Sequence, residues 1–164
     1  MDGTSILDTG ALLVMPISMI SGGSALDSQR IELRRLDPER MEMIDLLVKW
    51  VEPGEESIYR AREIARESGD LAGLSEVDLG LLALAIELEK PLLTDDYRLQ
   101  NLCGIAEIEC SPIETEGIAS IWSWEIRCLA CGKTYPQPSE TTPKREGVGE
   151  CSDCGSPLKL RKRP

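Results

Sequence analysis

The chain has 164 residues, with 18 Lys and Arg against 29 Asp and Glu, and no histidine, which gives a formal net charge of −11. The missing imidazole excludes Ser–His–Asp and Cys–His nucleophiles, imidazole general bases and imidazole metal ligands. No apolar run reaches the roughly 20 residues of a membrane span and no signal-peptide pattern is present, so we expect a soluble, cytoplasmic protein with no membrane partner.

The first half of the chain alternates short apolar runs with helix signals. In chain order the pattern predicts a strand at 5–7, a short helix at 11–15, a strand at 17–20 and a helix capped by Asp27 or Ser28 and ending at 36. A helix then runs from Pro38 towards 50, with a strand at 48–51 as the alternative for its last residues. Pro38 suits the first turn of a helix, because its missing N–H is not needed there.

The next part of the chain continues this alternation. The pattern predicts a helix over 55–68 ended by Gly69, a helix capped by Ser75, a buried strand at 91–94, a helix over 97–102 and a last strand at 105–108. Short strands that alternate with helices are typical of a parallel α/β sheet, so the fold class is α/β with helices flanking the sheet.

Acidic residues stand where two of these strands end. Asp8 follows the first strand, and Asp95 and Asp96 follow the strand at 91–94. Functional side chains of parallel sheets gather at the carboxyl ends of strands, near the topological switch. Asp78 opens the helix that leads into the second of these strands, and Glu32 lies on an earlier helix.

Such a group of carboxylates would repel itself unless a cation neutralises it. Mg²⁺ and Mn²⁺ prefer oxygen ligands, and they can activate water for attack on a phosphodiester. A structural explanation exists for each acid, since Asp8 suits an Asx-turn, Asp78 a helix cap and Glu32 a solvated helix surface. Asp95 and Asp96 compete for one role, and either could simply cap the next helix.

Four of the six cysteines form two Cys-x-x-Cys pairs, Cys128 with Cys131 and Cys151 with Cys154. A glycine follows each pair, as the tight turn of a zinc knuckle favours, and this spacing predicts one structural Zn²⁺ held by four thiolates. A rubredoxin-like iron site is the chemical alternative, and two redox or structural thiol pairs are a weaker one. Cys103 and Cys110 lack such spacing, and we expect them to be small buried residues.

The charge divides the chain into two unlike parts. Residues 1–120 hold 10 basic and 24 acidic residues, a net of −14, whereas residues 121–164 hold 8 and 5, a net of +3. We expect an acidic α/β domain at 1–112, a connector at 113–124 and a zinc ribbon with a basic tail at 125–164. Within the second part, 118–127 suits a strand and 134–149 a loop with one short strand. The tail at 159–163 is either a solvated terminus or a phosphate contact.

Several motifs together resemble the PIN-domain nucleases. The opening Ile6-Leu7-Asp8-Thr9-Gly10-Ala11-Leu12 is similar to the first PIN motif. Leu74-Ser75-Glu76-Val77-Asp78 and Leu93-Thr94-Asp95-Asp96-Tyr97 resemble the Nob endonucleases of archaea and eukaryotes, which carry a zinc ribbon after the PIN domain. The order of these motifs is more specific than any one of them, and the short chain resembles the archaeal form.

The resemblance implies a function and a set of catalytic residues. Asp8, Glu32, Asp78 and Asp96 match the four PIN acids, and the Thr-x-Asp pattern selects Asp96 over Asp95. Asp8, Asp78 and Asp96 would hold Mg²⁺ or Mn²⁺, and Glu32 would orient a ligand or a metal-bound water. The implied activity is cleavage of single-stranded pre-rRNA at the 3′ end of small-subunit rRNA, with the pre-small ribosomal subunit as partner. The rivals are a toxin-type PIN ribonuclease and a non-catalytic RNA- or protein-binding scaffold.

Overall fold

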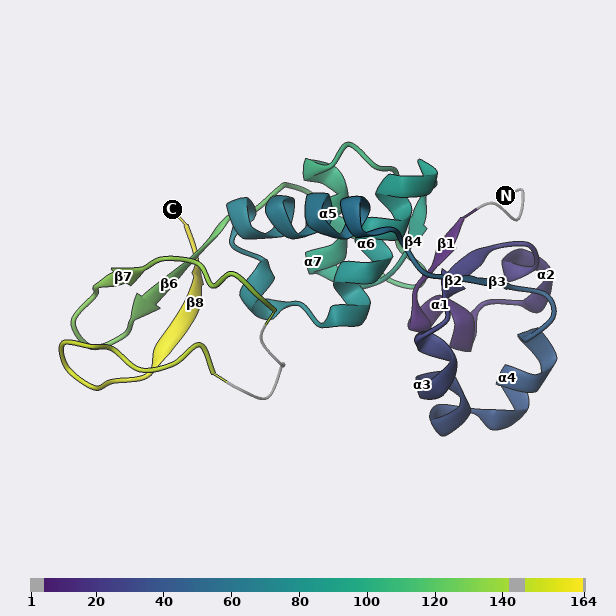
Figure 1. Cartoon of the computed structure of the whole chain (residues 1–164), viewed down its shortest axis with the longest axis horizontal. Coiled ribbons are helices and arrows are strands. Elements are labelled where there is room, and N and C mark those ends of the chain that lie inside the picture. The colour runs from purple at the N-terminus through teal and green to yellow at the C-terminus, as the bar shows by residue number, and fades with distance from the viewer. Residues whose placement is uncertain (1–4, 142–146, 164) are drawn as a thin grey trace.

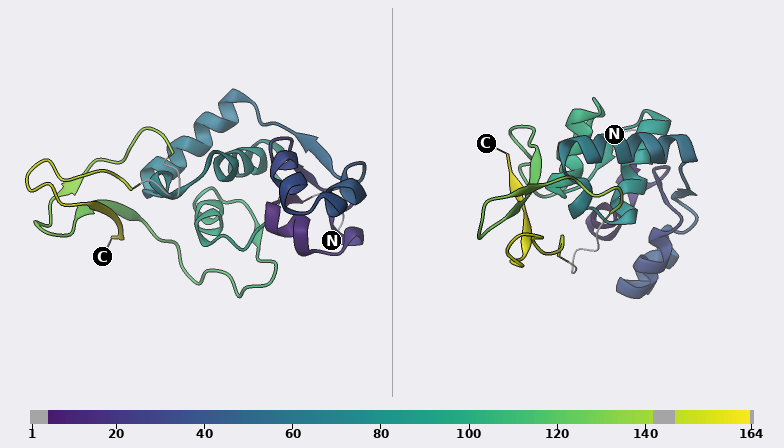
Figure 2. Two further views of the ribbon diagram at one scale, coloured as in Figure 1. Left: turned by 90° about the horizontal axis from the view of Figure 1, so that it is seen from below. Right: turned by 60° about the vertical axis from the view of Figure 1, so that its left-hand side comes forward.

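The computed structural model describes residues 5–141 and 147–163, which form two separate sheets (Figure 1). The larger sheet has five parallel strands in the order β3-β2-β1-β4-β5, and the smaller has three antiparallel strands in the order β7-β6-β8. The elongated molecule carries the smaller sheet at one end, standing away from the larger domain (Figure 2). The predicted α/β fold followed by a small ribbon is confirmed.

The larger sheet is built from short strands connected by helices. Its strands are β1 (Ile6–Leu7), β2 (Ser24–Leu26), β3 (Lys49–Val51), β4 (Leu92–Leu93) and β5 (Cys110–Ser111). The helices are α1 (Thr9–Val14), α2 (Ile17–Ile20), α3 (Gln29–Leu36), α4 (Pro38–Ile44), α5 (Glu55–Ser68), α6 (Glu76–Leu88) and α7 (Tyr97–Ile105). The chain builds β2 and β3 on one side of β1 and then β4 and β5 on the other. The topological switch point therefore lies between β1 and β4.

Two apolar cores cover the two faces of this sheet. One core joins α5, α6 and α7 to the sheet, and the other joins α1, α3 and α4 to it. Helix α6 is apolar around most of its circumference, as expected of a buried helix. A Cβ at Gly80 of α6 would lie 2.8 Å from Leu26 Cδ1, so this glycine lets α6 approach β2 closely. Among the helices in the described ranges, none is long and apolar enough to cross a bilayer.

Two predicted strands were wrong. Residues 17–20 form the helical turn α2, in which Ser21 N–H donates to Ile17 O at 3.0 Å and Ile20 is buried. The strand on this side is β2, a wholly buried segment that the sequence pattern did not reveal. The predicted strand at 105–108 is also wrong, because α7 continues to Ile105 and the left-handed Glu107 follows. The last strand is β5, which pairs with β4 just before the stretch predicted as a connector.

The ribbon sheet consists of β6 (Trp124–Cys128), β7 (Thr134–Tyr135) and β8 (Leu158–Lys162). Most of the basic tail at 159–163 therefore forms strand β8 of this sheet. Opposed residues of an antiparallel pair share a face, so the pairs Arg127–Lys159 and Glu125–Arg161 lie on one face of the sheet. The other face carries Ile126 and Leu158, which pack into a small core.

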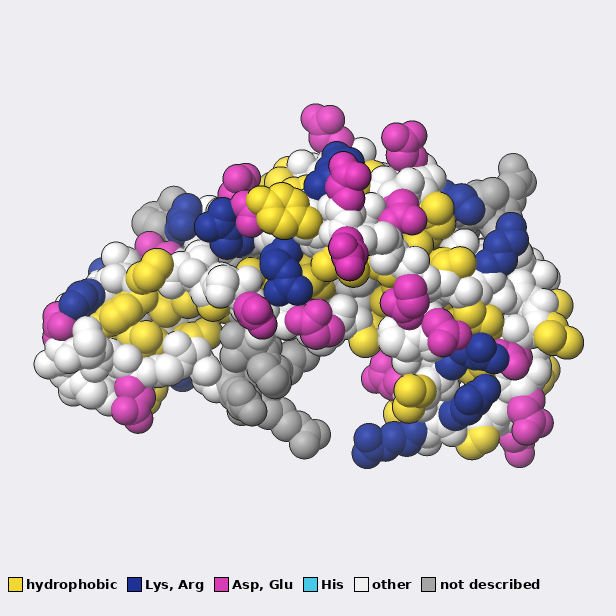
Figure 3. Space-filling view, in the orientation of Figure 1, with side chains coloured by type: hydrophobic (Ala, Val, Ile, Leu, Met, Phe, Trp, Pro, Cys, Tyr) yellow, Lys and Arg dark blue, Asp and Glu magenta, His cyan; other side chains and the backbone are white. Residues whose placement is uncertain are grey.

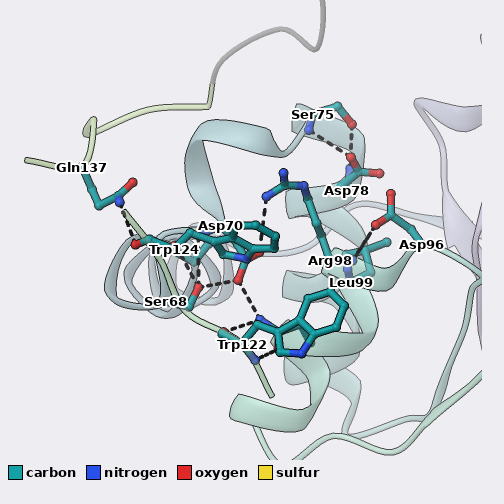
Figure 4. A network of polar contacts seen from close by, with 12 residues as sticks. Ser68, Asp70, Ser75, Asp78, Asp96, Arg98, Leu99, Trp122, Trp124 and Gln137 are labelled. Atoms are coloured by element: carbon teal, nitrogen blue, oxygen red, sulfur yellow. Dashed lines mark hydrogen bonds and ion pairs between the residues drawn. The ribbon is translucent and has the colours of Figure 1, made fainter. Parts of the chain in front are cut away.

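A buried carboxylate joins the two parts of the molecule. Asp70 is 0% exposed and follows α5, and its Oδ2 accepts from Ser68 Oγ at 2.7 Å and Asn101 Nδ2 at 2.9 Å (Figure 4). The Asn101 amide in turn holds the chain before β6, since Nδ2 donates to Trp122 O at 2.8 Å and Oδ1 accepts from Trp122 N–H at 2.6 Å. Arg98 Nη1 lies 3.5 Å from Asp70 Oδ1. One acid of the larger domain thus positions the start of the ribbon.

The backbone also approaches closely at this junction. Gly69 ends α5 with a φ of 85°, and a Cβ there would lie 2.2 Å from Trp124 O. Gln137 Nε2 donates to the same carbonyl at 3.1 Å. Ala72 packs into the ribbon core beside Ile126. Only glycine fits at position 69, both for its left-handed backbone and for this contact.

The buried Asp70 predicts a pH dependence of stability. Burial raises the pKa of its carboxyl, although bonds from Ser68 and Asn101 and the charge of Arg98 act in the opposite direction. The folded state then holds this proton at a pH where the unfolded chain has released it, so the contribution of Asp70 to stability falls as pH rises through the folded pKa. We expect wild type to gain stability relative to Asp70→Asn as pH is lowered from about 7 to about 4.

Urea unfolding at a series of pH values measures this difference. Glu56→Gln, on the exposed surface of α5, is the control for removal of a surface charge. A difference between wild type and Asp70→Asn that is constant with pH, or that shrinks on acidification, would contradict the assignment.

Candidate active site and metal centre

Two aspartates lie side by side where the central strands end. Asp8 follows β1 and Asp96 comes three residues after the end of β4, and these strands are direct neighbours at the switch point. The buried Thr94 connects them, because its Oγ1 donates to Asp8 Oδ2 at 2.5 Å and accepts from Asp96 N–H at 3.0 Å. The Asp96 carboxylate also caps α7 by accepting from Arg98 N–H at 2.8 Å. The parallel ladder and one hydroxyl thus fix both acids.

A third aspartate opens α6. Asp78 and Ser75 form a reciprocal capping box, with Ser75 N–H donating to Asp78 Oδ2 at 3.0 Å and Asp78 N–H donating to Ser75 Oγ at 3.1 Å. The cap predicted from the sequence is therefore present, and Asp78 is only 8% exposed. A carboxylate can accept several hydrogen bonds or bind a metal at either oxygen, so a structural role does not prevent a chemical one.

Glu32 reaches the same region from α3 and is held more loosely. Its Oε2 accepts from Thr9 Oγ1 at 3.3 Å, and that hydroxyl accepts from Gln29 Nε2 at 3.1 Å. Gln29 is itself buried, and its Oε1 accepts from Leu26 N–H at 2.8 Å. A chain of polar contacts thus runs from β2 to Glu32, which is exposed on its helix.

All four acids line a single open cavity of about 660 Å³ between α3 and the start of α6. The space-filling view shows the surface hollowed between the α3–α4 region and the middle of the molecule (Figure 3). The cavity is bordered by acidic, hydroxyl and apolar side chains and by one cation, namely Asp8, Thr9, Ser28, Ile31, Glu32, Arg35, Ser75, Val77, Asp78 and Asp96. The structure therefore brings together every acid that the sequence selected at this site.

The acids influence one another. Burial raises the pKa of Asp8, and the charges of Asp78 and Asp96 raise it further, against the lowering effect of the bonds from Thr94 and Thr9. A carboxyl with a raised pKa is one whose negative charge the surroundings do not fully compensate. A cation placed among the three aspartates would supply that compensation.

Asp95 does not line the cavity. Its carboxylate instead accepts from Ile113 N–H at 2.8 Å and from the N–H groups of Glu114 and Thr115 at about 3.1 Å. Burial acts to raise the pKa of Asp95, but these bonds outweigh it and lower the pKa. Asp95 anchors the segment that follows β5, so its position differs from that of Asp96.

Sequence reasoning missed three residues of this region. Thr94 bonds to both Asp8 and Asp96, although the Thr-x-Asp pattern points only to its aspartate. Gln29 and Arg35 lie on α3 beside Glu32. Helical spacing could have placed Arg35 near Glu32, since residues three apart share a face, but no pattern marks a buried glutamine like Gln29.

The cysteines form a second, quite different cluster. The four Sγ atoms all lie within 4.8 Å of one another, with Cys128 to Cys154 and Cys131 to Cys151 each at 3.5 Å. Zn–S bonds of about 2.3 Å at tetrahedral angles place thiolates about 3.8 Å apart, so the cluster has the size of a closed four-sulfur site. Cys128 and Cys151 are buried, whereas Cys131 and Cys154 face outwards.

The two knuckles have matching backbones. Gly132 and Gly155 take φ values of 77° and 69°, and their N–H groups donate to Cys128 O at 3.1 Å and Cys151 O at 2.9 Å. The left-handed glycines expected from the sequence are therefore present. The Tyr135 hydroxyl donates to Cys151 Sγ at 3.0 Å, and this bond, together with backbone N–H groups of Asp153 and Cys154, lowers the pKa of that thiol to about 6. A thiol that is readily deprotonated is suited to metal binding.

Within the described ranges, the cysteine cluster is the one group whose ligand atoms are this close. The carboxylates line a wider cavity, which fits a cation that keeps part of its water shell, as Mg²⁺ does. The remaining thiols are not part of either site. Cys103 is buried as expected, while Cys110 is only half-buried.

The parallel sheet and the acidic cavity at its switch point define a PIN-like domain. The family model described as "PIN domain of ribonuclease" matches residues 6–88, and the chain belongs to this family. The matched segment begins at β1 and includes Asp8, Glu32 and Asp78.

Curated relatives share this similarity. The chain is 37% identical to Endoribonuclease Nob1 of Pyrococcus abyssi over 69% of its length and 65% of the relative's, and 38% identical to Endoribonuclease Nob1 of Methanocaldococcus jannaschii over 70% and 53%. It is 28% identical to Ribonuclease VapC1 of Thermoplasma acidophilum over 94% of its length and 76% of that relative's. The chain thus matches between half and two thirds of the length of the two Nob1 relatives.

Proposed function

We propose that this chain is a metal-dependent endoribonuclease that cleaves single-stranded pre-rRNA at the 3′ end of small-subunit rRNA, on the pre-small ribosomal subunit. The observation that carries the proposal is the single cavity lined by Asp8, Glu32, Asp78 and Asp96 in a chain of the PIN family. The relatives named Endoribonuclease Nob1, at 37% and 38% identity, support endonucleolytic cleavage of RNA. The rRNA substrate is what the resemblance of the motifs to the Nob endonucleases implies. A cytoplasmic location accords with that substrate.

Asp8, Asp78 and Asp96 are the residues that would hold Mg²⁺ or Mn²⁺. Their oxygens suit either ion, and the raised pKa of Asp8 marks a charge that a cation would balance. When bound, such an ion supplies activation of water and stabilisation of phosphate charge. Glu32 lines the same cavity from α3 and would orient a ligand there.

The other polar residues of the cavity would hold the acids and the substrate. Thr94 keeps Asp8 and Asp96 in register through its two hydrogen bonds. Arg35 is the one cation among the residues that line the cavity, and it is exposed. An exposed guanidinium beside carboxylates suits a phosphate of the RNA backbone, which it would bind next to the scissile bond.

The ribbon would be folded by one structural Zn²⁺ held by Cys128, Cys131, Cys151 and Cys154. The size of the cluster and the absence of any open coordination position among four thiolates favour a structural metal over a catalytic one. Iron is the chemical alternative that metal analysis distinguishes.

The ribbon would also supply affinity for RNA. Arg127, Lys159 and Arg161 share one face of the sheet with Glu125, which lies 3.7 Å from Arg127, and Arg127 and Arg161 border an open depression there. Residues 121–164 carry a net charge of +3, against −14 for residues 1–120. Because the acidic domain repels a phosphate backbone, the basic sheet face is the part of the molecule suited to attract it.

A second candidate function follows from the other relatives. The VapC1 relative matches 94% of the chain, against 69% and 70% for the two Nob1 relatives, and is named a ribonuclease. The two candidates share the acidic site and differ in substrate. Cleavage of a pre-rRNA 3′ fragment in preference to tRNA or mRNA supports the first, and the opposite preference supports a toxin-type ribonuclease.

Asp78→Asn tests the catalytic assignment. Asparagine can accept the Ser75 hydrogen bond and keep the helix cap, but it removes a negative charge from the cavity. We expect Mn²⁺-dependent cleavage of a pre-rRNA 3′ fragment to fall by more than about 100-fold, with little change in melting temperature.

Glu76→Gln is the matched control, since Glu76 also lies in the first turn of α6 but does not border the cavity. Its cleavage rate should stay near that of wild type. Full activity in Asp78→Asn would remove Asp78 from the site, and absence of cleavage in wild type with Mn²⁺ and Mg²⁺ would refute the proposed function.

Cys151→Ser tests the ribbon metal. The substitution removes one buried ligand and the bond from Tyr135, so the metal should be lost and the smaller sheet should unfold. Metal analysis is expected to find one zinc per wild-type chain and none in the variant. Hydrogen exchange should accelerate in β6 and β8 while β1 and β4 stay protected.

Cys103→Ser, a thiol in the core of the larger domain, is the control that should retain zinc. Iron in place of zinc in wild type would change the metal assignment. Protection of β6 and β8 that survives metal loss would show that the ribbon folds without it.

A further inference from the structure

A small aromatic pocket lies at the junction of the two parts of the molecule, outside the acidic cavity. It has a volume of about 160 Å³. The residues that line it come from the end of α5, from α7 and from the entrance to the ribbon, namely Asp70, Tyr97, Arg98, Asn101, Trp122 and Trp124. Two indoles and a phenol thus converge where the chain passes from the larger domain into the ribbon.

The aromatic rings are arranged with cations around them. The Trp122 and Trp124 rings pack edge to face, with centroids 6.0 Å apart and an interplanar angle of 81°. The Arg98 guanidinium lies 4.9 Å from the Trp124 ring centroid, and Lys162 Nζ lies 4.4 Å from that of Trp122. Tyr97 is 48% exposed and Trp122 is half-buried, so apolar ring surface remains open to a ligand.

The pocket adjoins the acidic cavity. Tyr97 and Arg98 directly follow Asp96, which lines that cavity. In the close-up view, the Arg98 side chain lies between Trp124 and the carboxylates of Asp78 and Asp96 (Figure 4). A chain molecule that occupied both sites would therefore pass over a guanidinium, which is a partner for its phosphate.

We propose that this pocket binds one unstacked base of the single-stranded RNA whose backbone lies in the acidic cavity. The inference rests on the proposed function and adds a subsite to it. A cavity near 150 Å³ accommodates a benzene ring, so about 160 Å³ admits one heterocycle and excludes a stacked pair. Single-stranded RNA is bound by stacking its bases on aromatic side chains and by pairing its phosphates with cations, and both groups meet here.

The pocket recognises the ring face of the base more than its edge. The Asn101 amide already bonds to Asp70 and to both backbone groups of Trp122. The Asp70 carboxylate already accepts from Ser68 and Asn101. Stacking surfaces are common to all four bases, so the subsite fixes the position of the strand while tolerating different sequences.

Fluorescence of 2-aminopurine, which falls when this base stacks on an indole, tests the proposal. The probe is placed at successive positions of a short unstructured oligoribonucleotide and mixed with the zinc-loaded full chain, without added Mg²⁺ or Mn²⁺. We expect strong quenching at one position or two adjacent positions. Trp122→Leu and Tyr97→Leu should each weaken RNA binding by about 10-fold and reduce that quenching. Trp122→Phe, which keeps an aromatic face, should restore most of the affinity.

Two control variants separate the subsite from general RNA affinity. Tyr59→Leu removes an exposed ring on α5, 64% exposed, and should bind as wild type. Arg161→Ala should weaken binding and reduce its salt dependence while the quenched position stays the same. Circular dichroism on Tyr97→Leu, which leaves the Asn101–Trp122 bonds intact, shows whether a loss of affinity reflects unfolding.

The outcomes distinguish the subsite from the nuclease. Quenching equal at all positions, or Trp122→Leu and Tyr97→Leu binding as tightly as wild type, overturns the subsite even where Mn²⁺-dependent cleavage is normal. If the free 2-aminopurine nucleotide is quenched as strongly as the labelled oligonucleotide, the pocket does not require an RNA strand and the proposal is overturned. No RNA binding by wild type overturns the subsite, and the separate cleavage assay then decides the proposed function.

Discussion

Mutual repulsion of carboxylates at the carboxyl ends of β1 and β4 is the constraint around which the larger domain is organised. A parallel sheet places Asp8 and Asp96 side by side, and α6 brings Asp78 to the same cavity. Hydrogen bonds hold each acid in place, because Thr94 bonds to Asp8, the start of α7 bonds to Asp96 and Ser75 bonds to Asp78. The same geometry that stabilises the helix ends therefore concentrates negative charge, which a divalent cation is suited to neutralise.

The negative charge around the cavity would leave the attraction of RNA to the second sheet. Residues 1–120, with a net charge of −14, repel nucleic acid, whereas the ribbon presents a basic sheet face and is hydrogen-bonded to the larger domain at its base. Asp70 and Asn101 make that attachment by bonding to the chain before β6, and Gly69 lets the two backbones meet. The aromatic pocket at this joint lies between the part that would attract RNA and the part that would cut it.

Local signals with a fixed geometric meaning were read correctly from the sequence. The clustering of the four cysteines, the Ser75 cap and the end of α5 at Gly69 are confirmed. Each of these features was indicated by residues close together in the sequence. Segment 17–20 was misread, since an apolar run of four residues suits a strand or a helical turn and tertiary packing decides between them. The predicted domain boundaries and the catalytic roles of the acids stay predictions.

What the sequence could not reveal depends on contacts between distant segments. The Asp70 network and the aromatic pocket join residues of α7 to residues that precede β6, and no spacing rule links them. The different positions of Asp95 and Asp96 likewise depend on a distant segment, because Asp95 accepts a hydrogen bond from Ile113 N–H.

Calorimetric titration of Mn²⁺ into the zinc-loaded, RNA-free chain tests the central claim most directly. Runs in two buffers of different ionisation enthalpy report the protons released. The account predicts that Mn²⁺ binds and displaces a proton from Asp8, with more protons released as the pH falls towards the raised pKa of this carboxyl. Asp8→Asn should remove that proton release and weaken binding. Absence of Mn²⁺ binding by wild type, or equal heat and proton release in Asp8→Asn, would contradict the account.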